Sequence, residues 1–174
     1  MLDVSSELRK LPELSASTLA ALVLGIAIAT ILAALGFQHL GGYDPCPMCF
    51  QQRYAYYLGI PAVAVALIVL RSQPKAAAAL LALVAIGFLV TTAIAVYQAG
   101  AEWKFWDPPA TCAAAAELPT FDVNNLDVSR KPAVCGIASW RFLGLSFAGW
   151  NAVISALLAA GALTAAVKTL RKRG

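Results

Sequence analysis

The sequence predicts an all-α membrane protein, a four-transmembrane-helix bundle with a long second loop on its outer face. Its composition excludes an ordinary soluble domain, because 60% of the 174 residues are hydrophobic, only 13% are charged, and the mean hydropathy is +0.74. Soluble domains of this size are about one quarter charged. The apolar residues are also gathered into four runs, each of the length that a helix needs to cross a bilayer.

The four runs contain no Asp, Glu, Lys or Arg, and we predict spans at about 18–37, 54–70, 76–98 and 142–167. The second run is short, and its helix is free to begin nearer Cys49. The first run is too long for the apolar part of a signal peptide, and three further runs follow it, so we expect a retained helix. Residues 1–174 are therefore expected to form a single integral membrane domain.

The Lys and Arg residues outside the spans predict the orientation of the chain. Eight of them lie on the side of the two termini and five on the other side. Because cytoplasmic segments carry an excess of Lys and Arg, we predict cytoplasmic termini and outer loops at about 38–53 and 99–141. The basic tail of residues 168–173 directly follows an apolar run, a position that favours a membrane surface over nucleic acid. Aromatic residues next to the second loop predict an interfacial belt: Trp103, Phe105, Trp106, Trp140 and Phe142.

All four cysteines lie between the apolar runs, in two pairs. Cys46 and Cys49 enclose two residues directly before the second span, where the positive end of the following helix favours thiolates. Cys112 and Cys135 have 22 residues between them in the second outer loop. In an oxidising compartment the default interpretation of such a pair is an inert structural disulfide. On an exposed loop, however, a disulfide is also open to attack by a thiolate of another protein.

A zinc site built from the four cysteines is the main inorganic alternative, since thiolates are typical ligands of tetrahedral zinc. Such sites usually combine two closely spaced pairs, which Cys112 and Cys135 do not supply, and His39 is the only histidine. A structural membrane protein with two inert disulfides is the other alternative. Four cysteines allow three pairings, and the sequence leaves the pairing open.

Arg53 is the most informative charged residue, because it follows Cys49 by four positions at the mouth of the second span. Positions four apart share one face of a helix, so we expect Arg53 to lie beneath Cys49. An arginine at membrane depth is costly and usually has a partner or a function, although its long side chain can also extend to the interface. In the functional interpretation it donates to a carbonyl oxygen of a lipid-soluble oxidant and stabilises the reduced form.

Short motifs in a fixed order complete the pattern. They are Phe37-Gln38-His39, Pro45-Cys46-Pro47-Met48-Cys49 with Arg53, Glu102-Trp103, Pro109-Ala110-Thr111-Cys112, Cys135, Trp140-Arg141-Phe142-Leu143-Gly144-Leu145-Ser146, and Trp150-Asn151. In this order and spacing the chain resembles the disulfide bond formation protein B (DsbB) family of bacterial inner membranes. The motifs span about residues 36–151, and the four-span layout extends the resemblance to nearly the whole chain.

The resemblance implies a thiol:quinone oxidoreductase, a quinone-dependent thiol oxidase of the inner (cytoplasmic) membrane. The disulfide of Cys112 and Cys135 would accept electrons from a periplasmic thioredoxin-fold dithiol oxidase of the DsbA type, with Cys112 receiving the attack. Cys135 would then exchange with Cys46. Cys49 would face a membrane quinone, ubiquinone or menaquinone, and Arg53 matches the quinone-associated arginine of the family. DsbA-type proteins are strong oxidants, at about −120 mV, so their reoxidation requires a still stronger acceptor such as a quinone.

The chain departs from the family pattern in two places. Many members have a histidine near the outer end of the third span, where this sequence has Tyr97-Gln98-Ala99. Gln98 can supply a hydrogen bond there but does not titrate. The segment 136–138 also lacks the acidic residues of the family, which bears on the choice of thiol partner. A protein like vitamin K epoxide reductase is a further alternative, but its Cys-x-x-Cys lies late in the chain, unlike Cys46 and Cys49.

Overall fold

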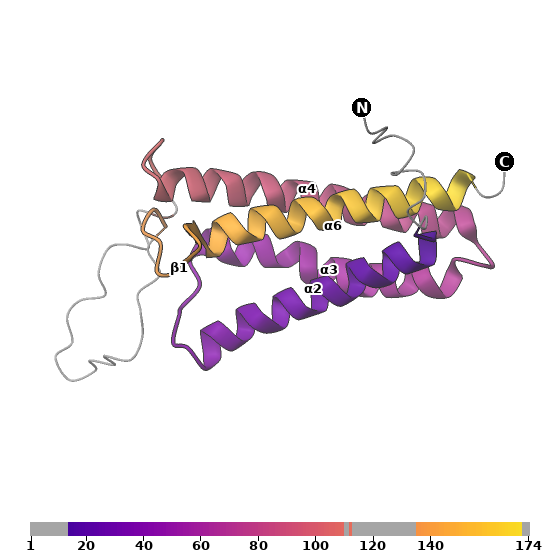
Figure 1. Cartoon of the computed structure of the whole chain (residues 1–174), viewed down its shortest axis with the longest axis horizontal. Helices are drawn as coiled ribbons and strands as arrows, with labels where there is room; N and C mark the ends of the chain where they lie inside the picture. The colour runs from indigo at the N-terminus through magenta and orange to yellow at the C-terminus, as the bar shows by residue number, and fades with distance from the viewer. Residues whose placement is uncertain (1–13, 110–111, 113–134, 172–174) are drawn as a thin grey trace, which may run out of the picture.

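The computed structural model of the chain describes residues 14–109, 112 and 135–171. Four long helices run along the length of the molecule, with α2 oblique to the others (Figure 1): α2 (Ala16–His39), α3 (Pro47–Val69), α4 (Pro74–Glu102) and α6 (Phe147–Arg171). Each is long and apolar enough to cross a membrane, with a mean hydropathy between 1.2 and 2.6 over its most apolar window. The chain is thus a multi-pass membrane protein, and the predicted four-helix bundle is confirmed. α2 begins and α6 ends at the same end of the bundle, where Lys168 Nζ donates to the carbonyl oxygen of Leu14.

The first turn of α3 is built from the Cys-x-x-Cys motif itself. Cys46 is the N-cap residue, and its Sγ accepts the backbone N–H of Cys49 at 3.2 Å. Pro47 occupies the first helical position, where a missing N–H costs nothing and a fixed φ favours the helix. The helix therefore begins seven residues before the predicted boundary at residue 54, nearer to Cys49. This corrects the predicted outer loop at 38–53, because residues 47–53 are helical.

The fourth helix also begins later than predicted, at Phe147 instead of Phe142. A short antiparallel hairpin precedes it, formed by β1 (Arg141–Phe142) and β2 (Leu145–Ser146). The turn residues Leu143 and Gly144 have φ angles of 50° and 84°, a left-handed conformation that glycine adopts without strain. Hydropathy does not separate an apolar hairpin from an apolar helix, which explains the error. The predicted second outer loop at 99–141 is shifted at both ends, since α4 continues to Glu102 and α6 begins only at Phe147.

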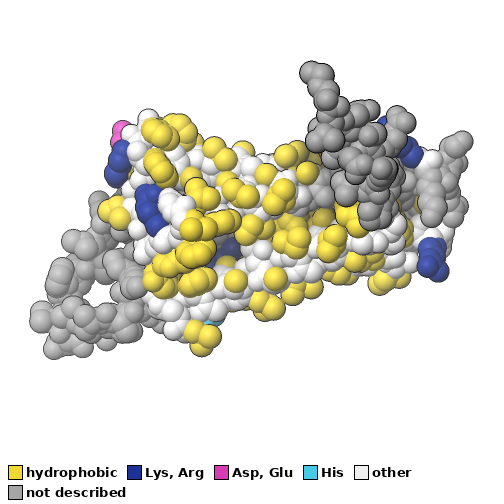
Figure 2. Space-filling view, viewed as in Figure 1, with side chains coloured by type: hydrophobic (Ala, Val, Ile, Leu, Met, Phe, Trp, Pro, Cys, Tyr) yellow, Lys and Arg dark blue, Asp and Glu magenta, His cyan; other side chains and the backbone are white. Residues whose placement is uncertain are grey.

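Small residues fill the interior of the bundle, so the helices approach closely. α4 packs against α3 and α6, and α2 packs against α3 and α6. Phe88 is fully buried and meets the ring of Tyr56 edge to face, with the centroids 5.1 Å apart. Apolar side chains also cover the outer surface along the length of the visible face (Figure 2), as expected for helices surrounded by lipid. The buried residues include Ala20, Ala66, Ala77, Leu81, Phe88, Leu158 and Ala162.

Candidate functional site

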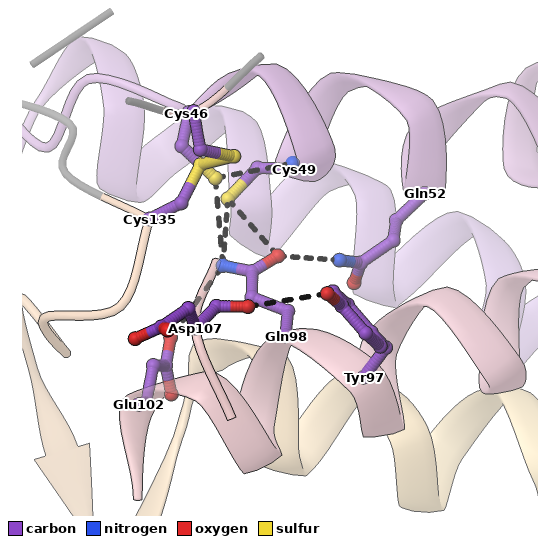
Figure 3. The surroundings of a disulfide bond; sticks show 9 residues. Cys46, Cys49, Gln52, Tyr97, Gln98, Glu102, Asp107 and Cys135 are labelled. Carbon is purple, nitrogen blue, oxygen red and sulfur yellow. Dashed lines mark hydrogen bonds between the residues drawn. A yellow bond between two sulfur atoms is a disulfide. The ribbon is translucent and has the colours of Figure 1, made fainter. Parts of the chain in front are cut away.

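All four cysteines meet at one end of the bundle. Cys112 and Cys135 form a disulfide with their Cα atoms 5.5 Å apart, and Cys46 and Cys49 are free thiols. Cys46, Cys112 and Cys135 are buried and pack in one cluster with Met48, against Cys49 and Ile94. Figure 3 shows Cys46, Cys49 and Cys135 side by side, next to Gln98. The structure therefore decides the pairing that the sequence left open, and it brings the two predicted pairs into contact.

The disulfide lies in a different environment from the one predicted. The sequence suggested an exposed bond on an outer loop, but Cys112 and Cys135 are each only 2% exposed. That prediction is wrong for this state of the molecule. The bond is buried because both cysteines pack onto the first turn of α3, where Cys46 and Met48 are buried as well.

The surroundings of Cys46, just before α3, disfavour loss of its proton. A hydrogen bond with the Cys49 side chain and burial both raise the pKa of the Cys46 thiol. The backbone N–H of Cys49 acts in the opposite direction, because it donates to the Cys46 sulfur, but it is the weaker influence.

Gln98 reaches from α4 to both free thiols. Its Nε2 lies 3.4 Å from Sγ of Cys46 and 3.5 Å from Sγ of Cys49 (Figure 3). The same nitrogen donates to Oε1 of Glu102 at 3.4 Å, one turn further along α4. Gln98 is only 4% exposed. The side chain that the sequence offered as a hydrogen-bond donor thus contacts the two sulfurs directly.

Three further polar residues continue from Gln98 into the bundle. Gln52 donates to Gln98, Asn151 donates to Gln52, and Tyr56 donates to Asn151, at 2.6–2.7 Å. Sequence reasoning missed this group, although Asn151 belonged to a quoted motif. The available signal was the presence of amide side chains within apolar helices, since polar groups at membrane depth need partners.

Arg53 lies one turn after Cys49, as predicted, and both residues line one cavity. Its Nη1 donates to Oε1 of Gln38 on α2 at 2.5 Å, and its guanidinium lies 5.6 Å from the ring centroid of Phe50. The partner expected for an arginine at this depth is therefore a side chain of the neighbouring helix. His39 is exposed at the end of α2 and does not line the cavity.

The cavity has a volume of about 560 Å³ and is lined by residues of α2, α3, α4, α6 and the hairpin. Its wall is mainly apolar, and a few polar groups converge on it. Ligand sites commonly have this character. A quinone, which has a flat apolar ring and carbonyl oxygens, fits these residues: an apolar wall, the Arg53 donor and the Cys49 sulfur. Lining residues include Ala33, Phe37, Cys49, Arg53, Phe147 and Ile154.

Metal ligands are not grouped in the part of the chain that the structure describes. No set of three or more His, Cys, Asp or Glu side chains there has a geometry that could hold a metal ion. Two of the four cysteines are joined to each other, so a zinc site of four thiolates is incompatible with this state.

Comparison with known proteins agrees with the motifs. A family model described as disulfide bond formation protein DsbB matches residues 16–165. The disulfide bond formation protein B of Polaromonas naphthalenivorans (strain CJ2) is 30% identical over 165 residues, covering 89% of this chain and 93% of the relative. That of Aromatoleum aromaticum (strain DSM 19018 / LMG 30748 / EbN1) is 34% identical over 173 residues, covering 88% and 94%. No solved structure was found to match. The chain therefore belongs to the DsbB family of disulfide-generating oxidoreductases.

Proposed function

We propose that the protein is a quinone-dependent thiol oxidase that reoxidises a periplasmic thioredoxin-fold dithiol oxidase of the DsbA type. Electrons pass from the Cys112/Cys135 pair to the Cys46/Cys49 pair and on to a membrane quinone. One observation carries the proposal: a disulfide and a free dithiol are packed together beside an apolar cavity that Cys49 and Arg53 line. The arrangement supports thiol–disulfide exchange on one side of the cluster and quinone chemistry on the other.

The first exchange involves the loop pair. A thiolate of the reduced partner attacks the Cys112 sulfur, the bond between Cys112 and Cys135 breaks, and Cys135 leaves as a thiolate. The second thiol of the partner then attacks the mixed disulfide, which releases the oxidised partner and leaves Cys112 and Cys135 reduced. Because both sulfurs are buried against Cys46 and Met48 here, the attack requires that the pair first separates from the cluster.

The second exchange transfers the same two electrons inward. In the oxidised state of the inner pair, the Cys135 thiolate attacks Cys46, the Cys46–Cys49 bond breaks, and Cys49 leaves as a thiolate. Cys112 then displaces Cys46, which restores the loop disulfide and leaves the inner pair reduced. The state described by the structure, with a loop disulfide and two free inner thiols, corresponds to the end of this step.

The cavity supplies the residues for the last stage. A quinone bound there would accept two electrons and two protons from the inner pair. Arg53, held by Gln38, would donate a hydrogen bond to a carbonyl oxygen and stabilise developing negative charge. The apolar wall excludes water from the reacting sulfur. Ubiquinone and menaquinone both meet these requirements.

The orientation in the inner membrane follows from the same proposal. The cysteine cluster faces the periplasm, which is kept oxidising, and both termini lie in the cytoplasm. Lys168 and Arg171 in the last turn of α6 support this arrangement, because basic residues favour the cytoplasmic side.

Quinone reduction by the purified protein in detergent tests the proposal, with a reduced DsbA-type protein as the electron donor. We expect loss of quinone absorbance that depends on the donor and is abolished by Cys46→Ala. Absence of turnover with ubiquinone and menaquinone, together with stoichiometric bound metal, would instead establish a metal-binding protein. Thiol trapping in cells adds a second readout: four cysteines that stay oxidised when quinone is depleted would indicate inert disulfides.

A further inference from the structure

A directional chain of hydrogen bonds leads from the interior of the bundle to the free cysteines. The Tyr56 hydroxyl donates to Oδ1 of Asn151 at 2.6 Å, and Nδ2 of Asn151 donates to Oε1 of Gln52 at 2.6 Å. Nε2 of Gln52 then donates to Oε1 of Gln98 at 2.7 Å. Each amide in the chain therefore has its oxygen occupied from the inner side and its N–H groups directed outward. The last N–H groups, those of Gln98, are directed to the sulfurs.

This series of hydrogen bonds determines which atom of the Gln98 amide can donate to the sulfurs. An isolated glutamine can present either its oxygen or its nitrogen, and only the nitrogen stabilises a thiolate. Here Gln52 donates to the oxygen of Gln98, and the nitrogen lies 3.4 and 3.5 Å from the sulfurs of Cys46 and Cys49. The Cys49 thiol also donates to the Gln98 oxygen at 3.9 Å, a contact that only the protonated sulfur can make, whereas a thiolate can accept only from the nitrogen. Successive hydrogen bonds in a buried chain also polarise one another, which strengthens the final donor. Hydrogen bonds to a charged acceptor are the stronger kind.

Glu102 competes with the sulfurs for this donor. The Gln98 amide has two N–H groups but three acceptors within 3.5 Å: the sulfurs of Cys46 and Cys49, and Oε1 of Glu102. Oε2 of Glu102 is buried and has no hydrogen-bond partner among the described residues. An ionised Glu102 therefore occupies one N–H of Gln98, and its charge opposes a thiolate nearby. Other charged groups around the site are Arg53 and Asp44 in the cavity wall, and Arg141, which donates to the Glu102 carbonyl oxygen.

We propose that Gln98 is a catalytic residue that stabilises the reactive thiolate of the Cys46/Cys49 pair through its amide N–H. Gln52, Asn151 and Tyr56 are positioning residues that hold this amide in its donating orientation. Glu102 limits the effect by competing for the same N–H groups. This assignment deepens the proposed function and rests on it, since it names the groups that set the reactivity of the inner pair.

Alkylation kinetics measure the thiolate directly, without quinone or partner. The full chain is purified in detergent, its inner pair is reduced, and iodoacetamide is added at neutral pH. Modified Cys46 and Cys49 are then quantified by tandem mass spectrometry. Gln98→Leu should slow alkylation of the pair by about tenfold, equivalent to about 1.4 kcal/mol, the order of one hydrogen bond to a charged group. Gln52→Leu should slow it by roughly threefold, and Glu102→Gln should accelerate it by roughly threefold.

Thr92→Val is the matched control, because Thr92 makes a part-buried hydrogen bond with Ser155 in the same bundle and no hydrogen bond of its own to Tyr56, Asn151, Gln52 or Gln98. Its alkylation rate should equal that of the unmodified protein. Equal slowing by Gln98→Leu and Thr92→Val, or no slowing by Gln98→Leu, would overturn the proposal. If Gln98→Leu does not fold, the other two variants test the proposal. Gln52→Leu should slow alkylation and Glu102→Gln should accelerate it, so a change of the alkylation rate in the same direction in both would contradict the proposal. Unexpected alkylation rates would refute the role of Gln98 and would not bear on quinone turnover. Conversely, the expected alkylation rates without quinone turnover would refute only the proposed function.

Discussion

The guanidinium of Arg53 on α3 donates a hydrogen bond to the amide oxygen of Gln38 on α2, with the two atoms 2.5 Å apart. The contact joins two helices at the wall of the cavity that Cys49 also lines. A neutral amide orients the guanidinium here and leaves its further N–H groups available to a ligand. The position of Arg53 is thus set by one local feature, its spacing from Cys49, and by one tertiary contact.

Arg53→Ala should weaken the use of quinone more than exchange with the thiol partner. We expect the KM for quinone to rise by about tenfold, because a hydrogen bond to developing charge is lost. Steady-state quinone reduction and stopped-flow exchange with the reduced partner measure the two effects separately. Gln38→Ala, which removes only the orienting contact, should give a smaller increase. An unchanged KM in Arg53→Ala would remove this residue from the quinone site.

Cys135→Ala should trap a mixed disulfide between Cys112 and the partner. Without Cys135 no loop disulfide can form. Under oxidising conditions the Cys112 thiolate therefore attacks the disulfide of the oxidised partner, one partner sulfur leaves as a thiolate, and no Cys135 thiolate is present to release the adduct. Non-reducing electrophoresis followed by mass spectrometry detects the adduct and its site. Cys112→Ala is the control and should yield none. If Cys112→Ala forms an adduct through Cys135 and Cys135→Ala forms none, then Cys135, and not Cys112, is the cysteine that bonds to the partner.

Gly100→Ala should destabilise the cysteine end of the bundle. A Cβ at position 100 would lie 2.0 Å from Cζ2 of Trp106, whose indole N–H donates to the Tyr97 carbonyl oxygen at 2.8 Å. The ring must therefore leave its place, at a cost of about 1–3 kcal/mol for overpacking. A thermal melt should show a lower Tm, and tryptophan fluorescence should shift. Gly25→Ala is the matched control, since nothing lies within 4 Å of its added Cβ. Equal melting temperatures for the two variants would contradict the packing described here.

Phe88→Ala should lower the stability of the bundle by about 3–5 kcal/mol. Phe88 is 0% exposed and contacts Tyr56 edge to face, so its loss leaves a cavity between α3 and α4. Leu83→Ala on the same helix is the control, because Leu83 is 64% exposed on the outer surface. Lipid or detergent fills the space that Leu83 vacates, and we expect a small change in Tm. A larger loss for Leu83→Ala than for Phe88→Ala would mean that the inner and outer faces of α4 are reversed.

The local features of the site could be read from the sequence. Cys46, Pro47 and Cys49 lie within one helical turn, and so do Cys49 and Arg53, so helix geometry alone relates their positions. The number of helices followed from run length, because a span requires a long uncharged segment. The start of α6 did not follow, since the apolar residues of the hairpin at 141–146 continue directly into the helix.

The remaining features depended on contacts between residues far apart in the chain. Sequence alone specified four apolar helices, two cysteine pairs outside the apolar runs and an arginine beside one pair, because each is a property of a short segment. Tertiary packing decided that Cys112 bonds Cys135 against Cys46, that Gln98 contacts both free thiols, and that the bond is buried. It also joined Gln52 to Asn151, 99 positions apart. A buried polar group must find its partner wherever the fold provides one, and no local pattern in the chain specifies which distant residue that is.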